Sequence, residues 1–337
     1  MELIVSERGS FVGKHQGRLR VTTDNGEKRE VPIMHLRQVI ICGGGVAISS
    51  DAVRACSEEG IPIHFISANG TPHASLYSAG LTGTVLTRRA QLRAYDGPAG
   101  VALARAFTLG KLGNQANLLR YAAKNRKETA PEVYEQLMAV AGEVVDYQIA
   151  VERLQGETVD ELREALMGIE GRYAARYWQA IGLLVPAELN WPGRETRGAS
   201  DPFNQVLNYG YGVLYGQVEH AIILAGLDPY AGLLHADRPG KPSLVLDLIE
   251  EFRQAVVDRP LLGQITRGWQ IGREEDGRLD KATRERIVSK VLERLESTEP
   301  YEGKRQPIRH ILQCQARHIA TFVRGERESY TPFVMGW

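Results

Sequence analysis

The chain has 337 residues, long enough for two domains or one large one. Hydrophobic residues make up 43% and charged residues 24%, and the formal charges cancel, which is typical of a globular protein. No apolar run reaches membrane-spanning length, which argues against a membrane protein. The N-terminus lacks a basic segment followed by an apolar one, so we expect no secretion signal. The cysteines Cys42, Cys56 and Cys314 are odd in number and far apart, which argues against disulfides and structural zinc and predicts a cytoplasmic location.

Roughly the first 85 residues predict a β-rich unit. Short β-branched runs (ELIVS, SFVGKH, RLRVTT, QVIICG) are separated by turn signals such as ERG and DNG. The segment SSDAVRACSEEG predicts a helix with Ser49 or Ser50 as N-cap and Gly60 just past its end, and strands return in IPIHFIS and PHASLYS. The segment CGGGVAISS has no phosphate-loop spacing, so we interpret it as a tight strand-to-helix turn.

From about Tyr95 onward the apolar residues recur at helical spacing. Helices are expected over residues 103–125, 131–145, 159–182 and 201–226. The sequence therefore predicts an α+β, two-domain protein: a small N-terminal β-rich domain over residues 1–88, then a larger all-helical C-terminal domain over residues 89–337.

Two stretches of the neutral chain are strongly basic. Residues 81–130 contain nine basic side chains against two acidic ones, and Lys304–Arg327 is opposed only by Glu326. A phosphate backbone responds to local basic surface rather than to whole-chain charge, so these stretches favour a nucleic-acid partner. Ordinary solvated helix faces are the alternative. The basic residues of the first stretch are Arg88, Arg89, Arg93, Arg105, Lys111, Arg120, Lys124, Arg126 and Lys127.

A helix is expected over residues 244–257, with Ser243 as its N-cap. Its apolar stripe consists of Val245, Leu248, Ile249, Phe252 and Val256. Asp247 and Glu250 are three residues apart, so their carboxylates share one face and repel each other. A bound cation would turn this repulsion into binding, whereas full solvation of both acids is the simpler alternative.

Two further residues strengthen the cation hypothesis. His235 precedes a basic loop that can fold back over the start of the acidic helix, although an isolated histidine is more often structural. Glu170 borders the apolar stripe of the helix expected over 159–182, where a buried charge needs a partner. One imidazole with two or three carboxylates is a hard, oxygen-rich ligand set that suits Mg²⁺ or Mn²⁺ better than zinc.

These features occur in an ordered set that resembles a known family. The set comprises GIEGRYAARYW, SDPFNQVLNYGYGVLYGQVEHAIILAGLDPYAGLLH and SLVLDLIEEFR, preceded by GGGVAISSDAVRACSEEGIPIHFIS. Together they resemble the CRISPR-associated nuclease/integrase family of spacer acquisition, over most of the chain and in the same order.

The resemblance implies a fold and a site. It implies a β-rich N-terminal domain that forms homodimers, a helical catalytic domain, and a small ferredoxin-like CRISPR-associated partner protein. It implies that Glu170, His235 and Glu250 are the catalytic residues and metal ligands; some family members carry aspartate in place of Glu250. Asp247 then lies close to the site, as an additional ligand or as a support for the ligands. Tyr215 matches a tyrosine near the active centre, and Asn204 and Tyr211 match positions that support packing or the site.

The function implied is insertion of new spacer DNA into a CRISPR array for antiviral defence. Mg²⁺ or Mn²⁺ would polarise a phosphodiester attacked by a DNA 3′-hydroxyl, or by water in simple cleavage. Arg88, Arg89, Arg93, Arg238 and Lys241 are candidate contacts to the DNA backbone, and Tyr215 is a further candidate for binding DNA. A metal-dependent phosphohydrolase of small molecules and a non-catalytic nucleic-acid-binding scaffold are the alternatives. The sequence does not specify the number of metal ions, the ion used in the cell, the array, or the role of the tail SYTPFVMGW.

Overall fold

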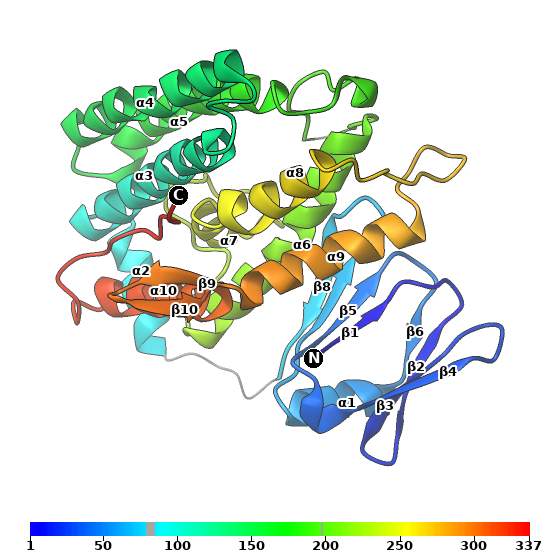
Figure 1. Ribbon diagram of the computed structural model, residues 1–337. Coiled ribbons are helices and arrows are strands. Elements are labelled where there is room, and N and C mark those ends of the chain that lie inside the picture. The colour runs from blue at the N-terminus through cyan, green and yellow to red at the C-terminus, as the bar shows by residue number, and fades with distance from the viewer. Residues whose placement is uncertain (79–84, 197) are drawn as a thin grey trace.

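The computed structural model describes residues 1–78, 85–196 and 198–337. A strand-rich N-terminal part lies beside a larger helical part, as expected (Figure 1). The helical part also contains a two-stranded hairpin that the sequence analysis did not predict, formed by β9 (Thr298–Tyr301) and β10 (Lys304–Pro307).

Two four-stranded sheets and one helix form the N-terminal part. The first sheet has the order β1 (Glu2–Val5), β5 (Gln38–Cys42), β7 (Ile63–Ile66) and β8 (Pro72–Leu76), parallel except for the β7–β8 pair. The second has the order β4 (Lys28–Pro32), β3 (Arg18–Thr22), β2 (Phe11–His15) and β6 (Ala47–Ile48). Helix α1 (Ser50–Glu58) follows β6, and its N-cap Ser49 accepts a hydrogen bond from Ala52 N, as predicted.

Strand β5 is buried on both faces, which explains its continuous apolar run. Val39 and Ile41 face a small core shared by the two sheets and α1, whereas Ile40 and Cys42 face the large core of the helical part. A strand buried on both faces needs apolar residues at every position rather than alternation. The first sheet is therefore the layer that joins the two parts of the molecule.

Helix α6 (Pro202–Leu224) lies against this sheet and carries the contact between the two parts (Figure 1). The loop after β7 approaches α6 so closely that a Cβ on Gly212 would overlap the carbonyl oxygen of Gly70. A Cβ on Gly70 would in turn meet the backbone of Tyr209. Both positions need glycine because backbone meets backbone here.

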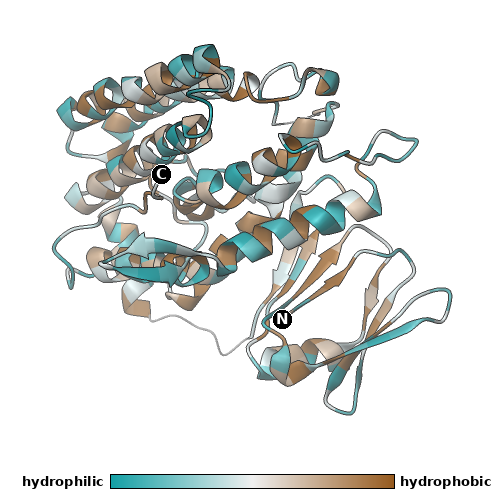
Figure 2. Ribbon diagram, in the orientation of Figure 1, coloured by the Kyte–Doolittle hydropathy of each residue, from teal (hydrophilic) through white to brown (hydrophobic). Residues whose placement is uncertain are grey.

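The other helices of the helical part turn their apolar faces toward a common core (Figure 2). Helices α3, α4 and α5 pack against one another, and α9 and α10 pack on α6. The bounds are α2 Val85–Ala94, α3 Pro98–Ala123, α4 Pro131–Arg153, α5 Val159–Gly182, α7 Ser243–Ile249, α8 Arg259–Ile265, α9 Lys281–Glu296 and α10 Ile308–Val323, with 3₁₀ turns at Ile33–His35 and Ala187–Leu189.

The single regular helix expected over residues 244–257 is wrong in detail. Helix α7 ends at Ile249, residues 250–252 form a turn, and Gln254–Asp258 form a π-helical segment that leads into α8. Ser243 is the first helical residue rather than the N-cap, and its hydroxyl instead donates to Tyr230 O at 2.5 Å. The predicted apolar stripe is nevertheless fully buried, because the chain stays helical overall.

The predicted strands are confirmed, but β4 and β6 were missed. The four long helices are confirmed too, although α3 begins earlier than expected, at Pro98, and α4 continues past 145 to Arg153. Helices α2, α9 and α10 were not predicted individually. The domain limits at 88 and 89 stay a prediction; residues 79–84, just before them, lie outside the described residues. No helix in the described ranges is long and apolar enough to cross a membrane.

A buried histidine, His64, and a half-buried one, His220, lie where the first sheet meets α6. His64 Nδ1 lies 3.1 Å from Ser75 Oγ, which donates to Glu219 Oε2, so His64 Nδ1 carries the proton and its Nε2 is left without a partner. The ring of His220 stacks on Tyr77 at 5.7 Å, and its Nε2 is also buried and unpartnered. Burial, assisted by the nearby charge of Arg309 on α10, lowers the pKa of His64 to about 3 and that of His220 to about 4.

These two histidines predict an acid-sensitive fold. Both folded-state pKa values lie below the unfolded value of 6.5, so the unfolded chain binds more protons as the pH falls from about 6.5 toward 4. Each histidine then lowers the free energy of unfolding by about 1.4 kcal/mol per pH unit in that range. Replacing His220 with Phe, which keeps an aromatic ring on Tyr77, should reduce the loss of unfolding free energy as the pH falls. Urea titrations at a series of pH values measure this slope. His73→Gln, at an exposed position, should leave the slope as it is; equal slopes in all three proteins would contradict the prediction.

Candidate active site

Two glutamates from different helices converge on one lysine. Lys111 on α3 places its Nζ 2.5 Å from Glu170 Oε1 on α5 and 2.8 Å from Glu250 Oε2 just after α7. The side chains of Lys111 and Glu170 are 13% exposed and that of Glu250 only 4%, so solvent screens this cluster weakly. The alternative that Glu250 is simply solvated is therefore wrong.

The charges around Glu250 keep it ionised. Burial would raise its pKa, but Arg253, whose Nη2 lies 3.2 Å from Glu250 Oε1, and Lys111 together lower that pKa to about 2. Burial likewise would lower the pKa of Lys111, yet the two glutamates raise it. The cluster is thus a fully charged, buried network in which every member depends on the others.

Asp247 supports His235 from behind. Its Oδ2 accepts hydrogen bonds from Leu233 N and Leu234 N at 2.6 and 3.1 Å, and its Oδ1 accepts from His235 N at 2.8 Å and His235 Nδ1 at 2.7 Å. A carboxylate held this way fixes the ring and its tautomer, leaving Nε2 as the free nitrogen. Burial would lower the pKa of His235, but Asp247 and the more distant carboxylates raise it. The alternative that Asp247 is simply solvated is also wrong, because its side chain is fully buried.

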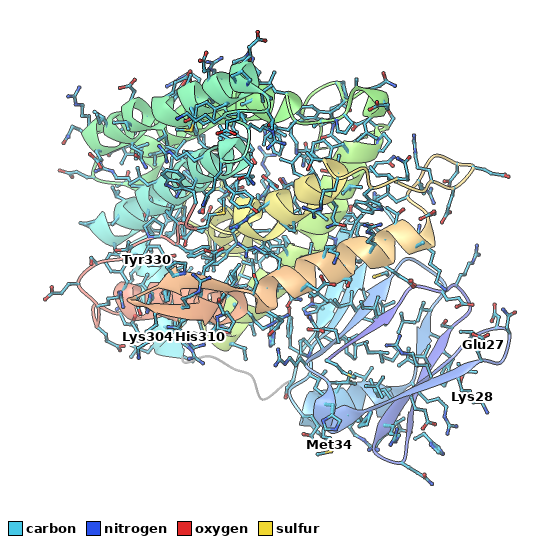
Figure 3. The ribbon with its side chains drawn as sticks, in the orientation of Figure 1. Glu27, Lys28, Met34, Lys304, His310 and Tyr330 are labelled. Carbon is cyan, nitrogen blue, oxygen red and sulfur yellow. The ribbon has the colours of Figure 1, made fainter. Side chains whose placement is uncertain are left out.

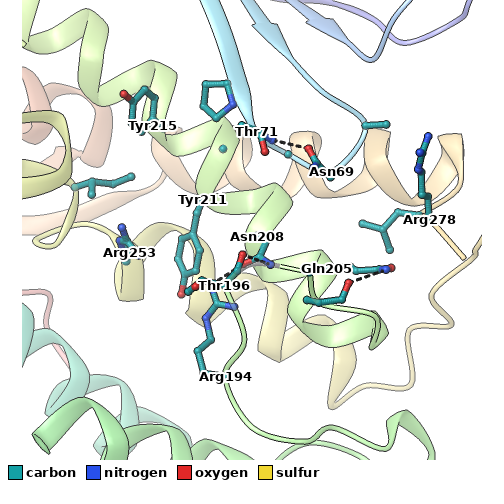
Figure 4. Close-up of a pocket in the computed structure, with 18 residues that line it drawn as sticks. Asn69, Thr71, Arg194, Thr196, Gln205, Asn208, Tyr211, Tyr215, Arg253 and Arg278 are labelled. Carbon is teal, nitrogen blue, oxygen red and sulfur yellow. Dashed lines mark hydrogen bonds between the residues drawn. The ribbon is translucent and has the colours of Figure 1, made fainter. Parts of the chain in front are cut away.

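A cavity of about 530 Å³ opens beside this cluster, between the loop after β7 and helices α6 and α7 (Figure 4). Arg194, Arg253 and Arg278 reach it, and no Asp or Glu is found among the described residues that line it. Tyr215 and Ile249 also line it. Arg194 donates to Asn204 Oδ1 and Asn208 Oδ1 at 3.0 and 2.6 Å, which fixes its position. The cavity is therefore cationic and suits a phosphate-bearing ligand.

Two tyrosines, Tyr211 in the cavity lining and Tyr177 on α5, hold a further buried acid. Tyr177 and Tyr211 donate to Asp258 Oδ2 and Oδ1 at 2.7 and 2.5 Å. Arg194 and Arg253 lie over the ring of Tyr211 at 5.3 and 4.9 Å. This packing supports the arginines of the cavity, in agreement with the supporting role expected for Tyr211.

The predicted DNA contacts lie apart from one another. Arg88, Arg89 and Arg93 are exposed on α2, which packs on α10 and α3 and does not line the cavity. Arg238 is exposed and Lys241 half-buried in the loop between His235 and α7. The first basic stretch is not one surface: among the residues described, Lys111 is in the cluster, and Arg105 and Arg120 donate to the carbonyl oxygens of Leu154 and Ala141.

The donor set fits a divalent cation. Among the described residues, no three His, Cys, Asp or Glu side chains are placed so that they could hold a metal ion as they stand. Glu170 and Glu250 both contact the ammonium group of Lys111, however, so together they attract a positive charge to one place. Glu250 Oε2 meets this ammonium as an ion pair without hydrogen-bond alignment, so this buried oxygen has spare acceptor capacity. Two carboxylates and an imidazole with its other nitrogen fixed are hard ligands for Mg²⁺ or Mn²⁺.

The sequence analysis missed three contributors to the site. Lys111 was counted only as part of a charge run, although its place in the apolar segment TLGKLGNQ is a signal for a buried, paired lysine. Arg253 follows Glu250 by three residues, a spacing that favours an ion pair. Arg194 follows no local pattern, because it is brought in by a loop.

A strand-rich domain joined to a helical domain, with an acidic and histidine centre beside an arginine-lined cavity, defines an enzyme that processes phosphodiesters. The chain belongs to the family of the CRISPR associated protein Cas1, whose family model matches residues 3–293. It is 38% identical over 349 residues to the CRISPR-associated endonuclease Cas1 1 of Archaeoglobus fulgidus, covering 100% of both chains. It is 34% identical over 347 residues to the CRISPR-associated endonuclease Cas1 3 of Thermus thermophilus, covering 98% of this chain and 96% of the relative.

Solved structures share the fold. A casposase bound to integration product matches with a TM-score of 0.83 and 22% identity, over 98% of this chain and 92% of that one. A Cas1 protein from Thermotoga maritima matches with a TM-score of 0.77 and 22% identity, over 100% and 99% of the two chains. The expected fold class, family and endonuclease activity are confirmed.

The support given by Asp247 can be tested with Asp247→Asn. An amide has only one acceptor oxygen for the four donors that the carboxylate serves, and it removes the charge that raises the pKa of His235. We expect that pKa to fall in NMR titrations, and activity with metal to fall about 10- to 100-fold, as for other supports of metal-ligating histidines. An unchanged His235 titration would show that Asp247 does not control the ring.

Proposed function

We propose that this Cas1-family endonuclease/integrase inserts new spacer DNA into a CRISPR array with Mg²⁺ or Mn²⁺ held by Glu170, His235 and Glu250. The observation that carries the proposal is the convergence of Glu170 and Glu250 on one cation, beside a histidine fixed by Asp247 and an arginine-lined cavity. When bound, the ion would polarise the scissile phosphodiester and stabilise its developing negative charge.

The protein's own groups divide the remaining work. Asp247 keeps the proton of His235 on Nδ1, so Nε2 would be the nitrogen that binds the ion. Arg253 pairs with Glu250 and also lines the cavity, so it links the acidic centre to the place where we put the phosphate. Arg194 and Arg278 supply further donors to phosphate oxygens in the cavity. No protein nucleophile is needed, because a DNA 3′-hydroxyl or water attacks.

The DNA backbone would extend from the cavity over basic surface. Arg238 and Lys241 lie in the loop that directly follows His235, close in the chain to the centre. Arg88, Arg89 and Arg93 are exposed on α2 and would hold the backbone farther away, without reading bases. Tyr215 lines the cavity and would pack against a nucleotide there.

Partners follow from the family. The casposase relative was solved with integration product, and a Cas6-RT-Cas1–Cas2 complex contains a chain of the same fold, with a TM-score of 0.78 over 99% of this chain and 36% of that one. We infer that this chain joins DNA together with a Cas2-type, ferredoxin-like partner. We also infer a homodimer through the N-terminal part, where Met34 is 81% exposed on the side away from the helices (Figure 3). Its free cysteines and its array substrate suit the cytoplasm.

The centre can be tested by removing its ligands one at a time. A labelled duplex with a free 3′-hydroxyl is incubated with a repeat-bearing supercoiled plasmid and Mn²⁺, and joining is followed on a gel. Glu170→Gln, His235→Ala and Glu250→Gln should each lower joining at least about 100-fold, since each removes a ligand of the ion. Chelation of the metal should abolish joining by the unaltered protein.

Glu164→Gln is the matched control, because Glu164 lies on the same helix as Glu170 but is exposed. It should join DNA at the rate of the unaltered protein. Nicking without joining, lost in the same variants, would retain the nuclease and show that the partner is required. Equal joining by all variants would overturn the assignment of the centre.

Lys111 offers a second test, because its ammonium occupies the point assigned to the ion. A divalent cation must displace this ammonium from both glutamates, so Lys111→Met should bind Mn²⁺ more tightly, by about tenfold or more. Isothermal titration calorimetry measures the affinity, with Lys124→Met at the exposed end of α3 as control. Weaker binding in Lys111→Met would show that the lysine organises the carboxylates rather than competing with the ion.

A further inference from the structure

The C-terminal residues Tyr330–Trp337, here named the C-terminal strap, return from α10 into the middle of the helical part. Figure 1 shows this segment in red, ending beside α3, and Figure 3 labels Tyr330 within it. Phe333 and Met335 are almost completely buried, with exposed fractions of 2% and 1%. The strap lies beyond residues 3–293, the range that the family model matches.

The strap binds the residue next to Glu250. Glu251 is fully buried, and its carboxylate accepts hydrogen bonds from Tyr330 Oη at 2.6 Å and Phe333 N at 2.8 Å, both in the strap. Gln315 of α10 donates to the same carboxylate at 2.7 Å. The ring of Phe333 stacks on Phe252 at 5.1 Å. Glu251 and Phe252, which directly follow Glu250 in the chain, are thereby held by the strap and α10.

The strap also binds the helix that carries Lys111. Asn114 Nδ2 donates to Phe333 O at 2.8 Å and to Glu251 O at 3.0 Å, while its Oδ1 accepts from Met335 N at 2.8 Å. Pro332 packs against Gly110 so tightly that a Cβ there would lie 2.8 Å from the proline side chain. A single fully buried amide therefore joins α3, the turn after α7 and the strap.

We propose that the C-terminal strap is a positioning element of the active site, which fixes Glu250 relative to Lys111 through Glu251 and Asn114. The regular helix stops at Ile249, and α7 holds Glu250 through hydrogen bonds from its backbone N–H to Asp247 O and Leu248 O, so its side chain needs a further constraint beyond the end of the helix. The strap supplies that constraint at Glu251, the residue next to Glu250. It also packs against α3 at Gly110, the residue next to Lys111. This inference rests on the metal centre proposed above.

The test compares the full chain with a chain ending at Ser329 and a control ending at Met335, which lacks only Gly336 and the exposed Trp337. Hydrogen exchange of peptides over residues 108–116 and 246–254 should rise in the chain ending at Ser329, while a peptide over α1 stays unchanged. Mn²⁺ affinity should fall about tenfold or more, the effect typical of lost support for a ligand. Affinity for duplex DNA should stay the same, because the cavity and basic surfaces are not touched.

A synthetic peptide of residues 329–337 added to the shortened chain should restore Mn²⁺ affinity. If the shortened chain does not fold, Tyr330→Phe and Phe333→Ala in the full chain replace it, with the same readouts. Unchanged exchange at 246–254 and unchanged Mn²⁺ affinity, in either set, would overturn the inference. Failure of the full-length chain to bind Mn²⁺ would instead contradict the proposed metal centre, and the exchange measurement would still decide the role of the strap.

Discussion

Four carboxylates are buried within twelve residues, and the helical part is organised around the need to compensate them. Asp247, Glu250, Glu251 and Asp258 are each at most 3% exposed. An unpaired buried charge costs several kcal/mol, so each acid must be met by donors from elsewhere in the chain. Asp247 is met by the backbone before α7, Glu250 by α3, Glu251 by α10 and the C-terminal strap, and Asp258 by tyrosines of α5 and α6. The segment is thus the point at which otherwise separate elements meet.

These acids differ in pKa because they contact different kinds of partner. Glu250 faces two cations, which outweigh burial and lower its pKa to about 2. Glu251 and Asp258 receive hydrogen bonds mainly from neutral groups, which do not outweigh burial, so their pKa values rise to about 7 and about 6. Adjacent acids in one turn therefore differ in affinity for a cation: Glu250 is prepared to bind one, and Glu251 is prepared to hold neutral donors.

Local pattern predicted much of this architecture, and tertiary contacts decided the rest. Apolar spacing gave the strands, the long helices and the buried stripe from Val245 to Val256, because each follows from the need to bury one face. Glu170, His235 and Glu250 could be singled out as residues that need a partner. Their partners could not, since Lys111 lies 59 residues from Glu170 and Arg194 arrives on a loop. The break after Ile249 was missed because the apolar stripe continues through it, and the strap was missed because its mixed composition has no period.

The break after Ile249 has a consequence for how one segment serves two ligands of opposite charge. Ile249 and Arg253 face the cationic cavity, Glu250 faces the acidic centre, and Glu251 faces the strap. The proposed cation and phosphate sites thereby lie side by side, with Arg253 shared between them through its ion pair with Glu250. A shift of the segment by one residue would put Glu251 at the centre and take Arg253 out of the cavity. Because the register decides which side chain would meet the ion and which the phosphate, it is consistent that Asn114, Tyr177 and the strap all hold this segment from positions outside the centre itself.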